Sequence, residues 1–326
     1  MNLLLLHSGA LGDTVLAAHI GMCFKAALRA ESLCMVARSG ILPWLKRRRL
    51  IDEAILQDDS PLVALYKATS TDPGAQEFLR RFDFVVSLLG NPAAEASVRL
   101  RSLTSSPCIC LDPRATQETL ENGTHITEQW RADLAAQGLS LDREARGLLD
   151  DRPVPDSEAV ARDAESTERI RLRTAASAYS RILLCHPGSG GLAKCCPLGS
   201  LDELIGHARG AGFHPAWMIG PDEVERSGSE YVKRLENVAP VLYEENVSDA
   251  AQLVDSADAY IGNDAGMTHV AALAGVPTIA LFGPTDPRVW RPIGVNVGVV
   301  RFPRADESTA IWAENVLAKL RLLLLP

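Results

Sequence analysis

The chain has 326 residues, of which 47% are hydrophobic and 23% are charged, and its formal net charge is −8. This length and composition predict a globular protein with two domains of ordinary size. Apart from the run Lys46-Arg47-Arg48-Arg49, the basic residues are dispersed, which argues against a nucleic-acid-binding protein. That run is either a solvated helix end or a local contact with an anionic partner. No apolar stretch approaches the roughly 20 residues that span a bilayer, so any membrane contact is expected to be peripheral.

The seven cysteines are an odd number. Neither Cys108-x-Cys110 nor Cys195-Cys196 has a second pair at zinc-binding spacing. We therefore expect free thiols in a reducing compartment, which here means the cytoplasm. The first six residues carry no basic region, and they predict a first strand instead of a signal peptide.

The first strand leads into a glycine-containing loop. Leu3–Leu6 is a continuous apolar run, typical of a strand that is buried on both faces, and the apolar spacing of residues 15–28 predicts a helix. Between them, Gly9 and Gly12 allow the backbone to lie close to a partner. The loop lacks the third glycine of the dinucleotide fingerprint and the Lys-Ser/Thr pair of a P-loop. Asp13 is therefore either a cap of this helix or a carboxylate that points into a ligand site.

Strands and helices alternate through the rest of the first half, which predicts a parallel sheet with helices on both faces. The expected strands are Leu33–Ala37, Ala54–Gln57, Phe84–Leu88 and Cys108–Leu111, and the expected helices are Ile41–Arg49, Pro61–Thr69, Ala75–Phe82, Ala93–Leu103 and Thr127–Gln137. Near residues 141–174 the strand pattern gives way to charged residues and prolines. We expect a linker there that ends in a helix over Glu158–Ala178, with domains at 1–170 and 171–326.

The second half returns to the layout of strand, glycine loop and helix. Its expected strands are Arg181–Cys185, Pro215–Ile219, Ala259–Ile261, Pro277–Phe282 and Val297–Val300, and its expected helices are Leu201–Ala211, Glu225–Leu235, Asp249–Ser256, Met267–Ala274 and Glu307–Leu322. The loop Gly188–Lys194 contains glycines and a serine whose N–H groups can surround a phosphate. Lys194 either assists this binding or is a surface lysine. Asp222 and Glu223 follow a strand end, where a carboxylate holds ribose hydroxyls, or they are the acidic residues of a helix start.

The stretch from Asp258 to Trp290 contains a strand, a glycine-rich turn, a helix and a second strand. Its polar residues Asp264, Thr268 and His269 lie where the first strand ends and the helix begins, which is the edge of a parallel sheet where ligands bind. A helix start offers free N–H groups and positive potential and suits an anion such as a diphosphate. The alternative is that Asp264 only caps the helix and that His269 is a buried histidine with satisfied hydrogen bonds.

Motifs in both halves carry a family resemblance. They are Gly9-Ala10-Leu11-Gly12-Asp13-Thr14, His186-Pro187-Gly188-Ser189-Gly190 with Lys194 and Pro197, Tyr260-Ile261-Gly262-Asn263-Asp264-Ala265-Gly266-Met267-Thr268-His269, and Leu281-Phe282-Gly283-Pro284-Thr285-Asp286-Pro287. In this order they resemble the family-9 glycosyltransferases, which are the ADP-heptose:lipopolysaccharide heptosyltransferases and their relatives. Residues 30–175 carry little of the resemblance.

The resemblance implies an α/β protein of the GT-B fold, with two Rossmann-like domains that face a central cleft. The N-terminal domain would bind the acceptor and the C-terminal domain the nucleotide sugar; in this fold a terminal helix, here 307–322, often packs back on the first domain. The implied enzyme is an inverting, metal-independent glycosyltransferase that moves a sugar, expected to be heptose, from an ADP-sugar to a cell-envelope glycan such as lipopolysaccharide core. It would need no cofactor, because the nucleotide sugar is a substrate. It would act in the cytoplasm, in peripheral contact with the inner membrane.

The same resemblance implies roles for individual residues. Asp13 would be the general base that takes the proton of the acceptor hydroxyl. Lys194 would stabilise the charge of the departing diphosphate together with backbone N–H groups, and Asp222 or Glu223 would hold the ribose. The further donor-binding residues would be Ser189, Gly190, Gly191, Asp264, Ala265, Gly266, Thr268 and His269, and the acceptor-side loop would contain Ser8, Gly9 and Gly12.

The sequence departs from the family pattern in two places. Cys196 stands where the pattern has tryptophan, and Ala265 stands where it has serine or threonine. Loss of that hydroxyl removes a hydrogen bond to phosphate worth about 1.5–3 kcal/mol. The changes keep two alternatives open: a catalytically degenerate protein that binds a nucleotide sugar or glycan, and a GT-B nucleotide-sugar epimerase that acts on a UDP-sugar.

Overall fold

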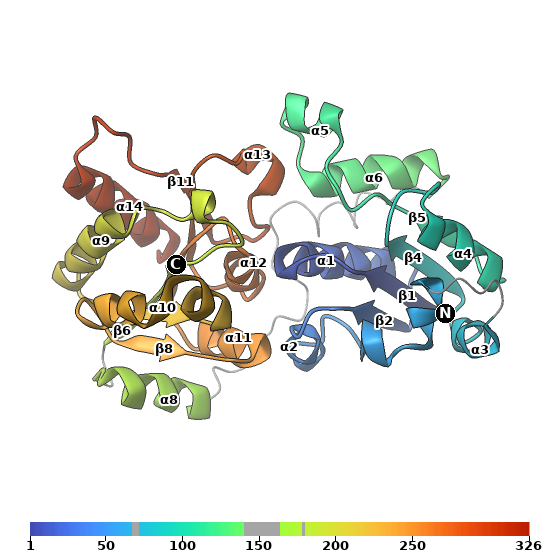
Figure 1. Ribbon diagram of the computed structural model, residues 1–326, viewed down its shortest axis with the longest axis horizontal. Helices are drawn as coiled ribbons and strands as arrows, with labels where there is room; N and C mark the ends of the chain where they lie inside the picture. The colour runs from blue at the N-terminus through green and yellow to red at the C-terminus, as the bar shows by residue number, and fades with distance from the viewer. Residues whose placement is uncertain (67–71, 140–163, 178–179, 326) are drawn as a thin grey trace. The chain divides into compact units, whose positions relative to one another are not determined.

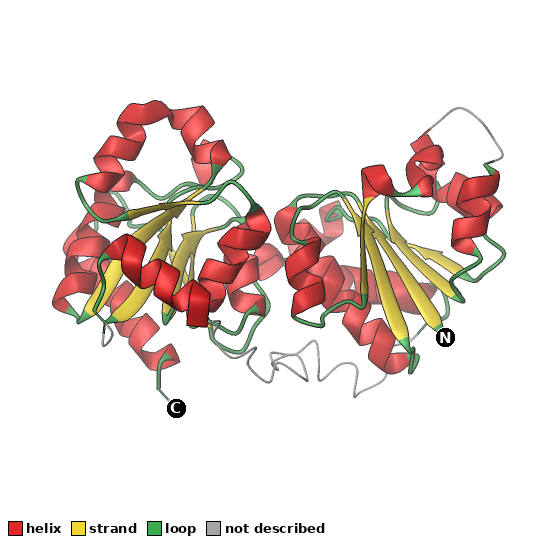
Figure 2. Cartoon of the chain, turned by 90° about the horizontal axis from the view of Figure 1, so that it is seen from below, coloured by secondary structure: helices red, strands yellow, loops and turns green. Residues whose placement is uncertain are grey.

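The computed structural model describes residues 1–66, 72–139, 164–177 and 180–325. By its internal contacts the chain divides into two compact units, Met1–Pro155 and Asp156–Pro326. Each unit contains one parallel β-sheet (Figure 1), and helices flank the strands of both sheets (Figure 2). The alternating strands and helices of the sequence therefore form the two α/β units that were predicted.

The first unit is built on a sheet of five strands in the order β3-β2-β1-β4-β5. These strands, all paired in parallel, are β1 (Asn2–His7), β2 (Ser32–Ala37), β3 (Glu53–Leu56), β4 (Phe84–Leu88) and β5 (Cys108–Cys110). The register joins Leu5 of β1 to Met35 on one side and to Val86 on the other. Because β1 is central and covered, Leu3–Leu6 are all buried, as their unbroken apolar run predicted.

The helices of the first unit follow its strands. They are α1 (Leu11–Ala27), α2 (Leu42–Arg47), α3 (Pro73–Leu79), α4 (Glu95–Leu103), α5 (Gln117–Asn122) and α6 (Ile126–Ala136), with the 3-10 helices η1 (Gln57–Asp59) and η2 (Pro61–Tyr66). Helix α3 starts at a capping aspartate, since Asp72 accepts a 2.9 Å hydrogen bond from the N–H of Ala75. Its buried Phe78 joins Leu4 and Leu6 in one hydrophobic cluster, which holds the helix against the sheet.

The second unit is built on a sheet of six strands in the order β11-β10-β9-β6-β7-β8. These strands, again all paired in parallel, are β6 (Arg181–His186), β7 (Phe213–Ile219), β8 (Val241–Tyr243), β9 (Ala259–Asn263), β10 (Thr278–Phe282) and β11 (Val297–Arg301). Every residue of β9 and of β10 is buried, because these strands have a neighbour on each side.

The helices of the second unit include one that spans the predicted domain boundary. They are α8 (Ala164–Thr174), α9 (Leu198–Gly210), α10 (Pro221–Glu236), α11 (Val247–Asp255), α12 (Gly266–Leu273), α13 (Pro287–Trp290) and α14 (Thr309–Leu323), with the 3-10 helix η3 (Leu192–Lys194). Helix α8 contacts α11 and β8, so it belongs with the second unit. The predicted boundary between residues 170 and 171 falls inside this helix.

The terminal helix α14 packs on α9 and against β10 and β11. Val316 and Leu320 lie in the hydrophobic core of the second unit, and the indole N–H of Trp312 donates a 2.8 Å hydrogen bond to the carbonyl of Arg301. The segment 307–322, which the fold resemblance associates with the first domain, therefore buries its apolar face in the second unit.

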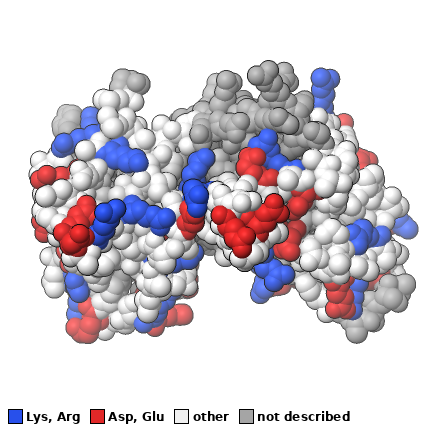
Figure 3. All heavy atoms as spheres, turned by 90° about the horizontal axis from the view of Figure 1, so that it is seen from above, with Lys and Arg blue, Asp and Glu red and all other residues white. Residues whose placement is uncertain are grey.

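Several predicted features can be compared with the structure directly. The prediction missed α5, β8 and α13, and residues 61–66 form a 3-10 helix instead of an α-helix. All seven cysteines are free thiols, as expected, whereas most of the predicted linker lies outside the described residues. In the described ranges no helix is long and apolar enough to cross a bilayer. On the face drawn in Figure 3, lysine and arginine side chains are mixed with acidic ones, which agrees with the dispersed charge of the sequence.

Candidate functional site

In the second sheet the strand order reverses between two neighbouring strands, β6 and β9. After β6 the strands continue to β7 and β8 on one side, and after β9 they continue to β10 and β11 on the other. Ligands bind open α/β sheets at such a switch point, outside the carboxyl ends of the strands. The loops that leave β6 and β9 contain most of the predicted donor-binding residues, so the fold brings these residues to one edge.

Asn263, the last residue of β9, joins these two loops. It is fully buried, and its side-chain amide donates a 2.8 Å hydrogen bond to the carbonyl of Pro187. Its side-chain carbonyl accepts a 3.0 Å hydrogen bond from the N–H of Cys196. The glycine loop after β6 is therefore fixed at both of its ends by one side chain, a role that the sequence did not predict.

Asp264 is the centre of a polar cluster at the same edge. Its side chain is only 6% exposed, and its Oδ2 lies 2.9 Å from Nζ of Lys194 and 2.7 Å from the donating hydroxyl of Thr285. The carbonyl of Asp264 accepts a 2.6 Å hydrogen bond from the hydroxyl of Ser189. The helix that follows has Ala265 as its N-cap, without a side-chain capping bond. The interpretation of Asp264 as only a helix cap is therefore excluded, and Lys194 has a partner inside the cluster.

Helix α12 presents its N-terminus at this cluster. Gly266 is its first residue, and the first N–H groups of a helix carry positive potential that suits an anion. Thr268 is fully buried, and its hydroxyl donates a 2.6 Å hydrogen bond to the carbonyl of Asn263, so its side chain fixes the turn. His269 is also buried in this helix, with 6% of its surface exposed. The turn therefore offers an anion its backbone N–H groups, with Lys194 beside them.

The glycine loop itself has an open side. A side-chain carbon added to Gly190 or to Gly191 would meet no atom within 4 Å, which leaves the backbone there accessible to a ligand. Nη1 of Arg226 donates a 2.7 Å hydrogen bond to the carbonyl of Ser189, so a second cation lies at the loop. Arg226 was missed by the sequence analysis, although it lies one turn after the predicted Asp222 and Glu223 on α10.

Glu223 is buried beside Gly188 of the glycine loop, whereas Asp222 is exposed. Oε2 of Glu223 accepts a 2.8 Å hydrogen bond from the N–H of Gly220, and Oε1 lies 3.5 Å from Nε2 of His186. Burial raises the pKa of the Glu223 carboxyl, but the hydrogen bond and charge of His186 and the N–H of Gly220 outweigh it and lower the pKa. A side-chain carbon on Gly188 would lie 1.8 Å from Oε1. Glu223 is thus an acidic residue of a helix start, which was one of the two interpretations of the sequence, and it packs against Gly188 of the loop.

In the first unit, the corresponding switch point lies between β1 and β4. The loop after β1 contains Ser8 and Gly9, and Gly12 and Asp13 lie in the first turn of α1. The N-cap of α1 is Ala10, without a side-chain capping bond. Asp13 is therefore not the cap of α1, and its carboxylate lies at the positive end of the helix, close to Gly9.

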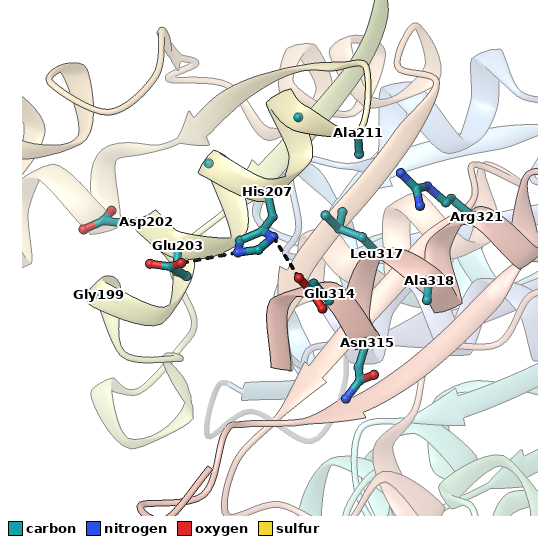
Figure 4. Close-up of a pocket in the computed structure, with 12 residues that line it drawn as sticks. Gly199, Asp202, Glu203, His207, Ala211, Glu314, Asn315, Leu317, Ala318 and Arg321 are labelled. Atoms are coloured by element: carbon teal, nitrogen blue, oxygen red, sulfur yellow. Dashed lines mark ion pairs between the residues drawn. The ribbon is translucent and has the colours of Figure 1, made fainter. Parts of the chain in front are cut away.

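A separate groove of about 1030 Å³ lies between α9 and α14 of the second unit (Figure 4). His207 projects into it, with Nε2 3.3 Å from Glu203 and Nδ1 3.9 Å from Glu314. None of the predicted site residues lines this groove. The groove is therefore distinct from the loop cluster at the sheet edge.

Among the described residues, no group of three or more His, Cys, Asp or Glu side chains could hold a metal ion.

Comparison with known proteins assigns the chain to a family. The sequence model of glycosyltransferase family 9 (heptosyltransferase) matches residues 76–319. The chain belongs to this family. Lipooligosaccharide heptosyltransferase 2 of Haemophilus influenzae is 27% identical over 172 residues, which are 50% of this chain and 49% of that protein. Lipopolysaccharide heptosyltransferase 3 of Escherichia coli K12 is 24% identical over 179 residues, which are 54% and 49% of the two chains. The match therefore spans about half the length of these relatives.

Solved structures of the family share the fold. The structure of E. coli ADP-heptose LPS heptosyltransferase II superposes with a TM-score of 0.68 at 19% identity, over 99% of this chain and 98% of that one. E. coli heptosyltransferase WaaC with ADP gives 0.63 at 17% identity, over 99% and 100%. The family-9 protein is therefore of the GT-B class, with two Rossmann-like units, as predicted. The matched residues 76–319 include the loops after β6 and β9 but not Asp13.

Proposed function

We propose that this family-9 protein is an inverting, metal-independent glycosyltransferase that moves heptose from ADP-heptose to a cell-envelope glycan such as lipopolysaccharide core. One observation carries the proposal: the cluster of Lys194, Asp264 and Ser189 at the N-terminus of α12. A cation, a helix N-terminus and an open glycine loop suit the diphosphate of a nucleotide sugar. Family membership and the similarity to heptosyltransferases support heptose as the sugar.

In this mechanism the acceptor hydroxyl attacks the anomeric carbon from the side opposite the diphosphate. The new bond joins the acceptor oxygen to that carbon, the bond to the diphosphate oxygen breaks, and Asp13 takes the hydroxyl proton. ADP leaves with the bonding electrons. Lys194, Arg226 and the N–H groups of the first turn of α12 meet its negative charge, which is the electrostatic role that a metal ion fills in other enzymes. Asp222, exposed on α10, is the residue we assign to the ribose.

The same proposal places the protein in the cytoplasm, at the inner face of the inner membrane, because a lipid-linked glycan is held there. The basic run Lys46–Arg49 at the C-terminal end of α2 supports a contact with anionic head groups. Lys46, Arg47 and Arg49 are exposed, whereas Arg48 is buried and lies 5.5 Å from the ring centre of Trp44. Lys46 and Arg49 can thus meet phosphates, whereas the cation–π contact of Arg48 stabilises the helix.

A second candidate function is binding without transfer. Helix α12 begins at Ala265 with no side-chain capping bond, so the cluster lacks the hydroxyl that the family pattern supplies. A site that lacks one phosphate hydrogen bond can still hold a nucleotide sugar through its backbone. In that case the protein would bind the donor and leave the sugar on it.

The proposal is tested with the purified full chain. ADP-heptose, and ADP more than UDP, should raise the melting temperature, since a ligand that binds only the folded state stabilises it. Heptose transfer to a heptose-free lipopolysaccharide acceptor should proceed in the presence of a metal chelator. Asp13→Asn should abolish transfer and keep the shift with ADP-heptose. Asp72→Asn is the matched control, because asparagine caps α3 as well as aspartate does.

Each outcome selects between the candidates. A melting-temperature shift without transfer or donor hydrolysis would favour the binding protein. A larger shift with UDP than with ADP would contradict the donor class. Loss of transfer on chelation would contradict metal independence, which matters because TibC, a heptosyltransferase of similar fold with a TM-score of 0.50, is described as iron-containing.

A further inference from the structure

His7, the last residue of β1, is a polar side chain that the proposed mechanism leaves unused. It is fully buried and lies where the strand turns into the loop that leads to Asp13. Its Nδ1 accepts a 3.3 Å hydrogen bond from the N–H of Gly9. Nδ1 also lies 3.2 Å from the hydroxyl of Thr14, which in turn lies 2.9 Å from the carbonyl of Ala10. His7 therefore ties the loop to the first turn of α1.

These contacts fix the position of the ring proton. A backbone N–H can only donate, so Nδ1 of His7 accepts from Gly9 and carries no proton. Burial lowers the pKa of His7 to about 4, so the ring is neutral at neutral pH. A neutral imidazole has one N–H, and here that N–H is on Nε2. The hydroxyl of Thr14 fits this arrangement, because it can donate to Nδ1 or to the carbonyl of Ala10.

The Nε2–H of His7 is buried and has no hydrogen-bond partner among the residues that the structure describes. A buried donor without an acceptor costs about 1–3 kcal/mol, so such a group calls for an explanation. The space beside Gly9 provides one. A side-chain carbon built on Gly9 would lie 2.9 Å from Nε2 of His7 and 3.3 Å from Oδ2 of Asp13. The donor and the carboxylate thus flank the same small volume, which is open only because residue 9 is glycine.

We propose that His7 is a positioning residue for Asp13, whose carboxylate accepts a hydrogen bond from Nε2–H in the orientation in which it takes the acceptor proton. The inference rests on the proposed function, in which Asp13 is the base. The proton of His7 stays on Nε2 throughout, and only the acceptor proton moves to Asp13. Tyr66, whose hydroxyl interacts with Ser8, and Arg38 are further titratable groups near this loop.

Two substitutions of His7 separate its two nitrogens. The side-chain amide of His7→Gln reaches the place of Nε2, whereas that of His7→Asn reaches only the place of Nδ1. H7Q should keep kcat within about threefold of the wild type, and H7N should lose about tenfold or more in kcat with an unchanged KM for ADP-heptose. In H7N the acid limb of the pH profile should move to higher pH, because the carboxylate loses a donor that favours its charged form.

The pKa of Asp13 can be measured without turnover by an NMR pH titration that follows the chemical shift of its carboxyl carbon. Asp13→Asn is used to assign the signal. The pKa of Asp13 should rise in H7N and stay near the wild-type value in H7Q. The proposal would be overturned if H7Q and H7N lost kcat equally and in proportion to their loss of melting temperature. It would also be overturned if the pKa of Asp13 were the same in the wild type and in H7N. If the wild type itself transfers no sugar, the proposed function fails, while the titration still decides whether His7 holds Asp13.

Discussion

The ion pair of Lys194 and Asp264 joins two side chains of unequal exposure. Their charged atoms are 2.9 Å apart, but the side chain of Lys194 is 40% exposed and that of Asp264 only 6%. A buried carboxylate needs partners, and Asp264 has a second one in the hydroxyl of Thr285. The ammonium group is thus held at the loop surface while part of it still faces solvent, which is where a diphosphate would approach.

Removal of Lys194 tests this arrangement at the scale of one residue. Lys194→Ala should reduce kcat/KM for heptose transfer by about 10²–10³-fold, the usual effect of losing one preorganised group that stabilises transition-state charge. The melting temperature should also fall, because the substitution leaves the buried carboxylate of Asp264 with the hydroxyl of Thr285 but without its cation. Transfer kinetics and a thermal melt of the same preparation measure both effects.

Lys233→Ala is the matched control for that substitution. Lys233 pairs with Glu230 at 2.8 Å, and its side chain is 65% exposed, so its removal should leave both transfer and melting unchanged. If K194A and K233A lost transfer to the same extent, Lys194 would have no special part in donor chemistry.

At the scale of elements, the loop after β6 and the start of α10 fit together through one close approach. Gly188 has no side chain, and Glu223 of α10 occupies the space that a side-chain carbon would need, with Oε1 only 1.8 Å from its place. The carboxylate cannot move aside without loss of its hydrogen bond to Gly220 and its contact with His186. The loop and the helix therefore hold each other's conformation.

Gly188→Ala should lower the free energy of unfolding by about 1–3 kcal/mol, the usual cost of overpacking, and should weaken ADP binding. Gly190→Ala is the control in the same loop, since an added carbon there meets nothing within 4 Å. Urea unfolding and ADP titration of the two variants give the comparison. Equal stability of G188A and wild type would show that Glu223 rearranges at no cost.

The sequence predicted those elements whose burial produces a clear pattern of apolar residues or a glycine at a helix end. The apolar run of β1 and the glycine stop of α12, where Gly275 has φ of +79°, follow from local chemistry. The edge strand β8 has three residues and, among the described strands, pairs with β7 alone, so its pattern is too short to recognise. Sites at strand ends were predicted for a similar reason, because parallel strands end at one edge. The hydrogen bonds of Asn263 and Arg226 were not, because their partners lie 76 and 37 residues away in sequence.

At the scale of the whole molecule, two buried histidines make stability depend on pH. Burial lowers the pKa of both His7 and His19 to about 4, with a smaller contribution from His125 in the second case. In the unfolded chain these rings titrate near 6.5. Between the two values the unfolded state binds more protons than the folded state, so the free energy of unfolding falls as pH drops from 6.5 toward 4.

The loss should approach about 3 kcal/mol for each ring, at about 1.4 kcal/mol per pKa unit, and both rings belong to the first unit. In the full chain, the protection factors of the amides of residues 1–139, which are corrected for the intrinsic exchange rate, should therefore fall between pH 7 and 5. His19→Leu should remove about half of this dependence. Both ring nitrogens of His19 lack a hydrogen-bond partner among the described residues, so the change sacrifices no described bond.

His207→Gln is the control for that substitution, because the ring of His207 lies at the surface groove beside α9 and should not alter exchange in the first unit. An H19L protein with the wild-type pH dependence would mean that His19 is protonated in the folded state, contrary to its burial.

The side-chain amide of Asn263 links the turn after β9 to the loop after β6, so that the two segments move together. Because it bonds to the carbonyl of Pro187 and to the N–H of Cys196, neither segment can shift without pulling on the other. A nucleotide sugar that touches only the glycine loop would thus also restrain the first turn of α12. The glycine loop and the first turn of α12 would therefore become rigid together when the nucleotide sugar binds.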